Sequence, residues 1–242
     1  MCAMCGIIGL SIKNKKINSG SILKELLLQS QIRGKHATGF SSYKDGKLTT
    51  VSEQVPAADF IKKNSIKESV VIAHCRYSTS DVLHNQPIQS KNCSIVHNGV
   101  ITQRDSKDWD VFGYKNLKTK NDSELLLKCL EGTENPFEKF PNASIAFGFL
   151  YNDGDILLGR NAARPLYIFK GDGFVGFAST FDIIKRAFKN LKIDVSIIET
   201  VPFKFYSIDK KLNISIVDLK NYDIKDKQIK TSNQIKNKYR LI

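Results

Sequence analysis

Two thiols stand at the start of the chain, and one has a neighbour that suits a nucleophile. Cys5 is followed by Gly6, which has no side chain and lets a ligand approach the sulfur closely. If Cys5 were the first residue of the working protein, its α-amino group would be a base of pKa about 7.7–8.0 beside a thiol of about 8.5. Read alone, a Cys-Gly pair more often starts a buried strand. Cys2 lacks a following Gly and carries little weight.

A second polar cluster, His97-Asn98-Gly99, follows an apolar run at residues 93–96. The Asn98 side-chain amide and the Gly99 backbone N–H are two donors next to each other. Two donors aimed at one point are what a developing oxyanion on an attacked carbonyl requires. Read alone, Asn-Gly is more often a plain turn.

Two further clusters carry charge. Arg76 and Thr79 lie in the segment 74–79, where a guanidinium can bind a carboxylate with two hydrogen bonds and a hydroxyl can add another. A structural Arg–Asp pair explains Arg76 equally well. Asp122 can accept hydrogen bonds from an ammonium group, although capping of the helix that follows is the stronger reading when its motif is taken alone.

Together these clusters describe one pocket: a thiol nucleophile, an amine base, an oxyanion pair, an Arg for a carboxylate and an Asp for an ammonium. Such a pocket fits an α-amino acid with a carbonyl in its side chain. Glutamine fits it best.

The elements that position these residues follow from periodicity and turn signals. Apolar residues at helical spacing predict three helices, at residues 21–32, 123–130 and 182–188. We expect Asn121 or Asp122 to cap the second, Gly132 to end it, and Ser179 to cap the third. Asp45-Gly46 predicts a tight hairpin turn. The predicted strands are residues 5–12, 40–43, 48–51, 70–74, 93–96, 144–150, 156–158, 166–169, 174–178, 203–208 and 212–217.

Many short strands with few helices that do not alternate strictly with them favour antiparallel sheets with helices layered outside. The predicted class is α+β. We divide the chain into residues 1–4, a leader or upstream start, one domain at residues 5–219, and a basic tail at residues 220–242.

Composition narrows the class of protein. The chain has 242 residues, 41% hydrophobic and 25% charged, which is typical of a globular protein and unlike disordered or collagen-like chains. No apolar run approaches the ~18–20 residues of a membrane span. The five cysteines are not spaced as pairs of metal ligands, so we expect free thiols in a reducing, cytoplasmic compartment, and neither a metal nor a cofactor.

The net charge of +13 comes mainly from lysine, and seven bases against two acids fall in residues 220–242. Nucleic-acid binding through this tail is a secondary hypothesis, because aromatic residues are not interleaved with the bases.

The clusters, in their order and spacing, resemble class II glutamine amidotransferase domains over roughly residues 5–218. As a set they are highly specific, whereas each is weak alone. The segments that carry the resemblance are residues 5–9, 33–39, 74–79, 85–87, 97–99, 122–124, 164–166 and 177–179.

The resemblance implies an N-terminal nucleophile hydrolase fold, a four-layer αββα sandwich of two mainly antiparallel sheets. It also implies that Cys5 attacks the glutamine amide, with Asn98 and Gly99 holding the oxyanion. By the same resemblance, the α-amino group of Cys5 acts as the base. Arg76 and Thr79 bind the α-carboxylate of glutamine, and Asp122 binds its α-ammonium. Arg33 lies on the loop that closes the pocket. Ammonia leaves, and water cleaves the γ-glutamyl thioester.

Two features depart from the family pattern. Residues Met1-Cys2-Ala3-Met4 precede the nucleophile, and we expect translation to start at Met4, whose removal frees the Cys5 amine. The alternatives are a clipped propeptide and an inactive protein. His36 stands where the family usually has Asp, and we assign it no role. This departure lies in the same segment as Arg33, the residue predicted on the closing loop.

Family enzymes usually join this domain to a synthase domain, and we expect here a separate ammonia-accepting synthase subunit. The alternatives are a stand-alone hydrolase of γ-glutamyl amides and a catalytically inactive basic binding or scaffold protein.

Overall fold

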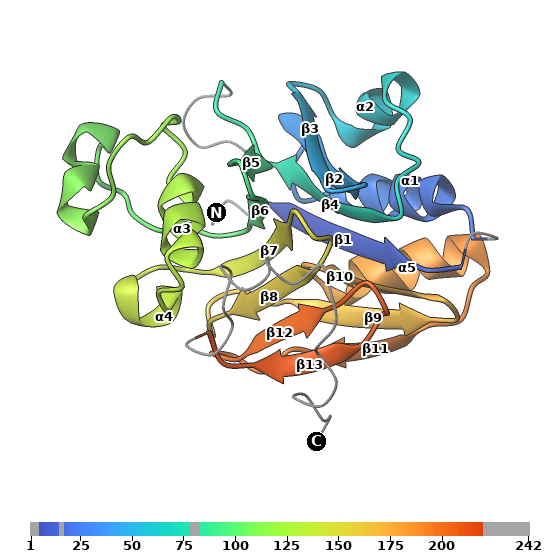
Figure 1. Ribbon diagram of the computed structural model, residues 1–242. Helices are drawn as coiled ribbons and strands as arrows, with labels where there is room; N and C mark the ends of the chain where they lie inside the picture. The colour runs from blue at the N-terminus through green and yellow to red at the C-terminus, as the bar shows by residue number, and fades with distance from the viewer. Residues whose placement is uncertain (1–4, 15–16, 78–82, 220–242) are drawn as a thin grey trace.

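A computed structural model describes residues 5–14, 17–77 and 83–219 (Figure 1). The leader at 1–4, Thr79 and the tail at 220–242 lie outside the described residues. The described helices are α1 (Ser19–Ser30), α2 (Ala57–Lys63), η1 (Ser106–Phe112, a 3₁₀ helix), α3 (Ser123–Glu131), α4 (Pro136–Lys139) and α5 (Phe181–Leu191). The described strands are β1 (Gly6–Ile12), β2 (Ala37–Lys44), β3 (Lys47–Glu53), β4 (Val70–Arg76), β5 (Ile88–Gln89), β6 (Cys93–His97), β7 (Ala146–Tyr151), β8 (Ile156–Arg160), β9 (Tyr167–Gly171), β10 (Phe174–Ala178), β11 (Ser196–Glu199), β12 (Phe205–Ile208) and β13 (Ile214–Val217).

The strands form two sheets in which every described ladder is antiparallel. The first sheet has the order β11-β9-β10-β1-β4-β2-β3, and the second has the order β13-β12-β8-β7-β6-β5. The first strand of the chain is therefore central in its sheet, between β10 and β4. Its two neighbours come from distant parts of the sequence.

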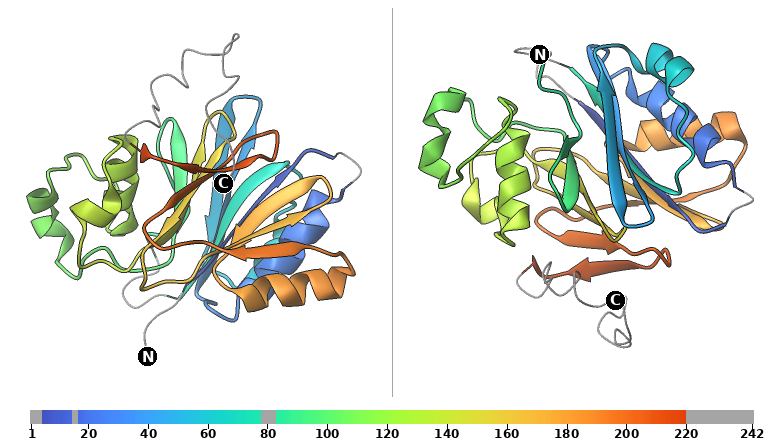
Figure 2. Two further views of the ribbon diagram at one scale, coloured as in Figure 1. Left: turned by 90° about the horizontal axis from the view of Figure 1, so that it is seen from below. Right: turned by 45° about the horizontal axis from the view of Figure 1, so that its top comes forward.

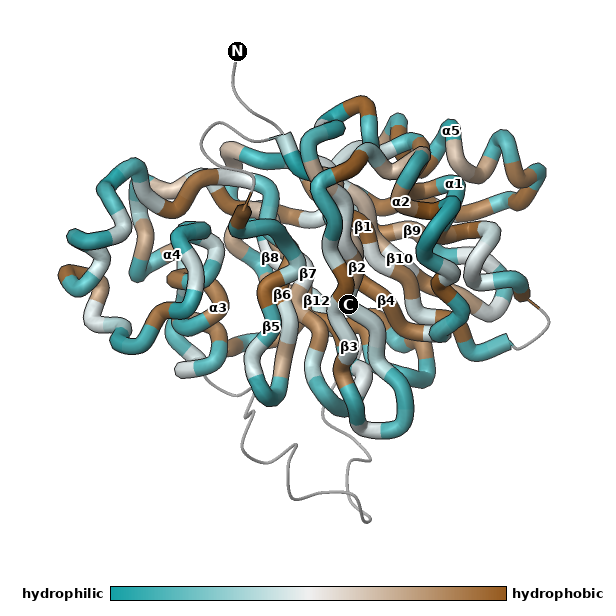
Figure 3. Tube along the Cα trace, turned by 90° about the horizontal axis from the view of Figure 1, so that it is seen from above, coloured by the Kyte–Doolittle hydropathy of each residue, from teal (hydrophilic) through white to brown (hydrophobic). Residues whose placement is uncertain are grey.

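The two sheets pack face to face, and helices cover both outer faces (Figures 1 and 2). One cluster of buried side chains joins the first sheet to α1, α2 and α5, a second joins the other sheet to α3, and a third fills the space between the sheets. Hydrophobic residues accordingly concentrate along the strands (Figure 3). The predicted α+β class and four-layer αββα sandwich are confirmed.

Alternation along β1 shows how the sequence builds these layers. Ile7 packs between the sheets, whereas Ile8 packs against the helices, as expected when successive side chains point to opposite faces. A Cβ at Gly9 or at Gly148 would lie 2.1 or 2.2 Å from the Phe177 ring. Both glycines therefore make room for this ring between the sheets.

The predicted hairpin is present. Strands β2 and β3 pair from Lys44 and Lys47 outward, and the two turn residues, Asp45 and Gly46, have φ of 49° and 82°. Positive φ at both central positions is the requirement of the tight turn that an Asp-Gly pair favours.

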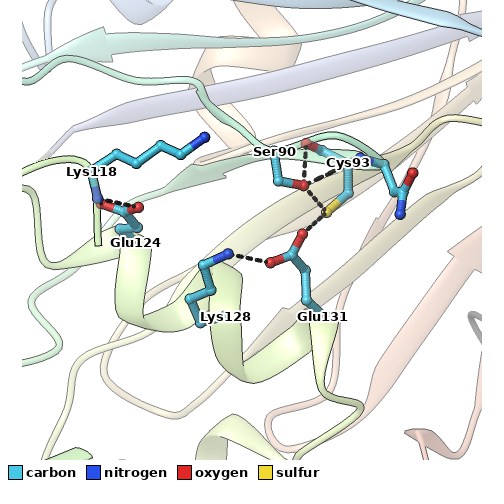
Figure 4. Close-up of polar contacts among 7 residues, drawn as sticks. Ser90, Cys93, Lys118, Glu124, Lys128 and Glu131 are labelled. Carbon is cyan, nitrogen blue, oxygen red and sulfur yellow. Dashed lines mark hydrogen bonds and ion pairs between the residues drawn. The ribbon is translucent and has the colours of Figure 1, made fainter. Parts of the chain in front are cut away.

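Helix α3 makes polar contacts at its two ends, with the preceding loop at its start and with β6 at its end (Figure 4). At its start, the buried Glu124 carboxylate accepts the backbone N–H groups of Lys118 and Thr119. At its end, Glu131 accepts from the Cys93 thiol at 3.4 Å and pairs with Lys128 at 2.9 Å. The Glu131 contact ties the end of α3 to β6, and at the start of the helix Ser123 Oγ lies 2.9 Å from His97 Nδ1 of the same strand.

Several expectations about helices need correction. The described residues contain α2, η1 and α4 besides the three predicted helices, because these short elements are stabilised by packing and carry little periodicity of their own. Ser179 does not cap the third helix: Thr180 accepts from Ile183 N–H, while Ser179 hydrogen-bonds the Ile7 backbone. The predicted end of α3 at Gly132 is present.

None of the helices in the described ranges is long and apolar enough to cross a membrane.

Candidate active site

Three residues predicted to do chemistry project into the same layer. Because Ile7, Ile72 and Val96 pack between the sheets, the period of two directs Cys5, Arg76 and Asn98 toward that layer as well. Each stands at an end of its strand, so the three meet where the apolar layer between the sheets gives way to polar groups.

Cys5 and Asn98 are in direct contact across the two sheets. The Cys5 backbone nitrogen donates to Asn98 Oδ1 at 3.1 Å. This bond fixes the orientation of the side-chain amide, which is fully buried, and leaves Asn98 Nδ2 without a hydrogen-bond partner in the structure. A buried amide donor without a partner costs free energy, and such a donor beside a nucleophile is suited to receive a ligand oxygen.

Gly99 continues the same edge. Asn98 N–H bonds the Ala146 carbonyl and Val100 N–H bonds the Ser144 carbonyl, so in this extended segment the Gly99 N–H points to the opposite side. A Cβ at Gly99 would lie 1.8 Å from the Ser144 carbonyl oxygen. Only glycine therefore lets the segment before β7 approach the predicted oxyanion pair this closely.

The loop after α1 reaches over Cys5. Arg33 Nε donates to the Cys5 carbonyl at 2.8 Å, and Arg33 Nη2 is buried without a partner. The loop lies tightly against the end of β4, because a Cβ at Gly34 would come within 2.2 Å of the Arg76 carbonyl carbon. The predicted closing-loop residue is therefore held at the nucleophile.

The environment of the thiol is buried and positively charged. Burial raises the pKa of Cys5 above its usual value. The Tyr77 backbone and the positive charges of three guanidinium groups oppose this rise; they belong to Arg76, Arg33 and Arg164. A thiol with a raised pKa is protonated at neutral pH, so its attack on a carbonyl needs a base that takes the proton.

Asp122 precedes α3 but does not cap it through its side chain. Its Oδ2 instead accepts the backbone N–H groups of Ile101 and Thr102 at 2.6 and 3.3 Å, and Asn121 Oδ1 accepts from Ser123 N–H. Burial raises the pKa of the Asp122 carboxyl, opposed by these N–H groups and by Arg76. Asp122 therefore occupies the predicted N-cap position of α3 without a capping hydrogen bond from its side chain, and the Asn121 side chain binds the first N–H of the helix instead.

Arg76 lies at the end of β4 and is 8% exposed. Its Nη1 donates to the His84 carbonyl at 2.7 Å and to Asn85 Oδ1 at 2.8 Å. Since its charge also acts on the carboxyl of Asp122, the two groups predicted to bind the ends of an amino acid lie in the same region.

A buried network supports the Asn98 segment from behind. His97 Nδ1 lies 2.9 Å from Ser123 Oγ and Nε2 lies 3.2 Å from the Ser144 carbonyl. Gln86 joins the network, since its Oε1 accepts from His97 N–H and its Nε2 donates to Ser123 Oγ. Burial lowers the pKa of His97 to about 4, so the ring is neutral at pH 7.

The structure thus brings together Cys5, Asn98, Gly99 and Arg33, and it places Arg76 where its charge acts on the Asp122 carboxyl. Thr79 lies outside the described residues. Each role that the resemblance assigns to these residues stays a prediction. His36, exposed, lies against Tyr77 with ring centroids 5.0 Å apart.

Two groups near Cys5 are not predicted from the sequence. Arg164 belongs to one of the segments that carry the resemblance but has no predicted role, yet its charge acts on the Cys5 thiol. The Tyr77 carbonyl lies 3.8 Å from Cys5 Sγ, a backbone contact for which side-chain identity gives no signal. Among the described residues, no three His, Cys, Asp or Glu side chains gather as a metal-ion site requires.

No protein-family model matches the chain. It is 24% identical over 196 residues to a glutamine–fructose-6-phosphate aminotransferase (isomerizing) of Oceanobacillus iheyensis, covering 71% of this chain and 31% of that protein. It is 27% identical over 149 residues to an amidophosphoribosyltransferase of Methanothermobacter thermautotrophicus, covering 57% of this chain and 31% of the relative. The chain therefore spans about a third of the length of these curated relatives.

Two solved structures share the fold. Glutamine phosphoribosylpyrophosphate amidotransferase from B. subtilis, complexed with ADP and GMP, matches with a TM-score of 0.70 and 19% identity, over 89% of this chain and 49% of that one. A structure described as the allosteric regulatory enzyme of purine biosynthesis matches with a TM-score of 0.67 and 18% identity, over the same shares. The predicted N-terminal nucleophile hydrolase fold is confirmed, as is the resemblance to class II glutamine amidotransferases, which are enzymes.

Proposed function

We propose that this chain, which resembles the glutamine-hydrolysing part of class II glutamine amidotransferases, releases ammonia from the side-chain amide of L-glutamine. The observation that carries the proposal is the Cys5–Asn98 contact. One end of the Asn98 amide is held by the Cys5 nitrogen, and the other end is a buried donor without a partner. A carbonyl attacked by Cys5 Sγ develops a negative oxygen that this donor and the Gly99 N–H stabilise.

The reaction requires that the bond before Cys5 be absent, so that its nitrogen is an amine. Cys5 Sγ then bonds the amide carbon while the thiol proton passes to the α-amine. The tetrahedral intermediate collapses, the C–N bond breaks, and the proton moves from the amine to the departing nitrogen as ammonia leaves. Water next attacks the γ-glutamyl thioester and glutamate is released, which restores the thiol.

Charged groups account for recognition of the amino acid. Arg76 binds the α-carboxylate together with Thr79, and Asp122 binds the α-ammonium. The Arg33 guanidinium has an unpartnered nitrogen and closes the pocket over Cys5. A buried charge is costly unless an opposite charge pairs with it. Arg76 and Asp122 therefore favour a zwitterionic amino acid, which supplies a partner for each, over a simple amide.

We further propose that the ammonia passes to a separate synthase subunit. Both curated relatives are named for transfer to a second substrate. Exposed apolar side chains flank the site residues; they are Ile32, Tyr77, Leu83 and Val100. A partner that covers this apolar rim would keep ammonia from bulk water. We also propose a cytoplasmic location, because the described cysteines are free thiols, as a reducing compartment favours.

The test is to make the chain from Met1 and from Met4, determine the intact mass of each product, and measure glutamate and ammonia from glutamine. Activity should accompany the product whose first residue is Cys5, and Cys5→Ala should abolish it. A full-length product with residues 1–4 still attached and with the same activity would refute the amine mechanism. Equal turnover of a γ-glutamyl amide other than glutamine would favour the stand-alone hydrolase.

A further inference from the structure

His74 is a buried histidine that the proposed chemistry does not use. It lies on β4, two residues before Arg76 and on the same face of the strand, and is 1% exposed. Val70 and Ile72 on that face belong to the apolar cluster between the sheets. On this face of β4, His74 therefore follows two aliphatic side chains and precedes Arg76, which belongs to the candidate site.

Neither ring nitrogen of His74 makes a hydrogen bond in the structure. Burial lowers its pKa to about 3, helped by the charges of Arg76 and His97, so at pH 7 the ring is neutral and has one N–H donor and one acceptor. An imidazole in an apolar layer with neither nitrogen satisfied costs stability. A valine or leucine would fill the same place without that cost, so the ring points to a role other than packing.

Across the layer, β4 lies against β6, and the backbone of His97 on β6 is among the groups that act on the pKa of the His74 ring. His97 immediately precedes Asn98, whose Oδ1 accepts from the Cys5 nitrogen. The nucleophile thus belongs to one sheet and the oxyanion donors belong to the other. Their separation depends on how the two sheets are spaced at this end.

Apolar contacts between the sheets are non-directional and set such a spacing loosely. A hydrogen bond across the layer is directional and has a narrow range of donor–acceptor distances, so it sets the spacing more tightly. Hydrogen bonds at catalytic sites are often long or poorly aligned without substrate and tighten when it binds. The His74 ring faces the layer in which Val96, the residue before His97, also packs, and its nitrogens have no other partner among the described residues, so its N–H is available for such a bond with the His97 carbonyl.

We propose that His74 is a positioning residue: its ring N–H holds the His97 carbonyl across the layer between the sheets and so fixes the Asn98–Gly99 donors at the distance that the oxyanion on Cys5 requires. The inference rests on the proposed function. It predicts that His74 acts on the transition state and leaves glutamine binding unchanged, because Asn98 and Gly99 contact the oxygen that becomes negative.

The test compares His74→Leu, which keeps the volume without a donor, with His74→Gln, which keeps a donor of similar reach. For His74→Leu, kcat for glutamine should fall about 10- to 100-fold with KM within about threefold, a smaller loss than removal of an oxyanion donor gives. Unfolding by urea should show equal or greater stability than wild type. His74→Gln should recover part of kcat. If His74→Leu does not fold, His74→Asn can replace it, because the Asn amide is too short to reach as far as that of Gln.

A binding readout separates positioning from a structural role. Glutamate γ-semialdehyde adds to a thiol and forms an oxygen at the oxyanion position, whereas glutamate does not. His74→Leu should weaken the semialdehyde at least tenfold and glutamate less than twofold. The matched control is Ser94→Ala, which removes the hydroxyl contact that joins the sheets at Ser41 (2.6 Å); it should change stability and leave kcat unchanged.

Each outcome decides the proposal. A His74→Leu enzyme with kcat within threefold of wild type, or one that loses both ligands equally, overturns it while the glutaminase function stands. If the wild-type protein with a free Cys5 amine neither hydrolyses glutamine nor binds the semialdehyde, the proposed function fails and this inference fails with it.

Discussion

Replacement of Asn98 by alanine should separate activity from stability. The substitution removes the 3.1 Å hydrogen bond from the Cys5 nitrogen, a loss of about 0.5–1.5 kcal/mol. It also removes a buried amide donor that has no partner, which relieves about 1–3 kcal/mol. These terms nearly cancel, so the free energy of unfolding of Asn98→Ala should lie within about 1.5 kcal/mol of wild type.

Activity should respond very differently. If Asn98 Nδ2 stabilises the oxyanion, its removal costs about 2.7–4 kcal/mol of transition-state stabilisation, a fall in kcat of about 10²- to 10³-fold with little change in KM. The assay is glutamate release from glutamine by the form that begins at Cys5, with urea unfolding of the same samples.

Asn161 provides the matched control, since it is equally an asparagine at a buried position but its side chain is satisfied at both ends. Its Oδ1 accepts from Ile145 and Ala163, and its Nδ2 donates to the Ala143 carbonyl. Asn161→Ala should lose about 2–4 kcal/mol of stability, from the buried groups left unpaired, and keep kcat. An Asn98→Ala protein that is strongly destabilised, or that retains kcat within about threefold, would refute the assignment of Nδ2 as an oxyanion donor.

Three further outcomes are expected. Gly6→Ala would bring a Cβ within 2.9 Å of the last carbonyl of α1 and should lower the free energy of unfolding by about 1–3 kcal/mol. The control is Gly132→Ala, where a Cβ would make only ordinary contacts; thermal unfolding should show little change in its stability. Burial lowers the pKa of His74 to about 3 and that of His97 to about 4. Below pH 6.5 the unfolded chain therefore binds more protons at these two residues than the folded chain does. The two groups together should lower the free energy of unfolding by roughly 3–4 kcal/mol between pH 7 and pH 5. In urea unfolding at the two pH values, His74→Leu should show about half of that loss, and an undiminished loss would contradict the pKa of His74. Because burial raises the pKa of Cys5, its alkylation by iodoacetamide should still accelerate above pH 8.5, and a plateau below pH 8 in the mass-resolved rate would contradict this.

Elements with a strong local signal could be predicted from the sequence. The Asp45-Gly46 turn defined the hairpin, and the strand at residues 174–178 has the predicted bounds. Elements that depend on tertiary contacts could not. Helix α2 has seven residues with Pro56 at its N-cap and no side-chain cap bond, and β11 is an exposed edge strand, so neither has the periodicity that identifies an amphipathic segment.

For the candidate site, the residue types that could do chemistry were visible, whereas their contacts were not. Nothing in the sequence shows that Asn98 Oδ1 accepts from the Cys5 nitrogen, because the two residues are 93 positions apart and belong to different sheets. The same holds for Arg164, whose charge reaches the Cys5 thiol only because the chain after β8 returns to that end of the molecule.

The place of the site follows from sheet order combined with alternation. Once β1 lies beside β4 and β6 lies on the facing sheet, a period of two requires Cys5, Arg76 and Asn98 to point into one layer. In the middle of the sandwich the same parity places aliphatic residues in that layer. The groups predicted to do chemistry therefore stand where the strands end. On β4, His74 is a polar side chain one step deeper than Arg76, in line with the apolar Val70 and Ile72.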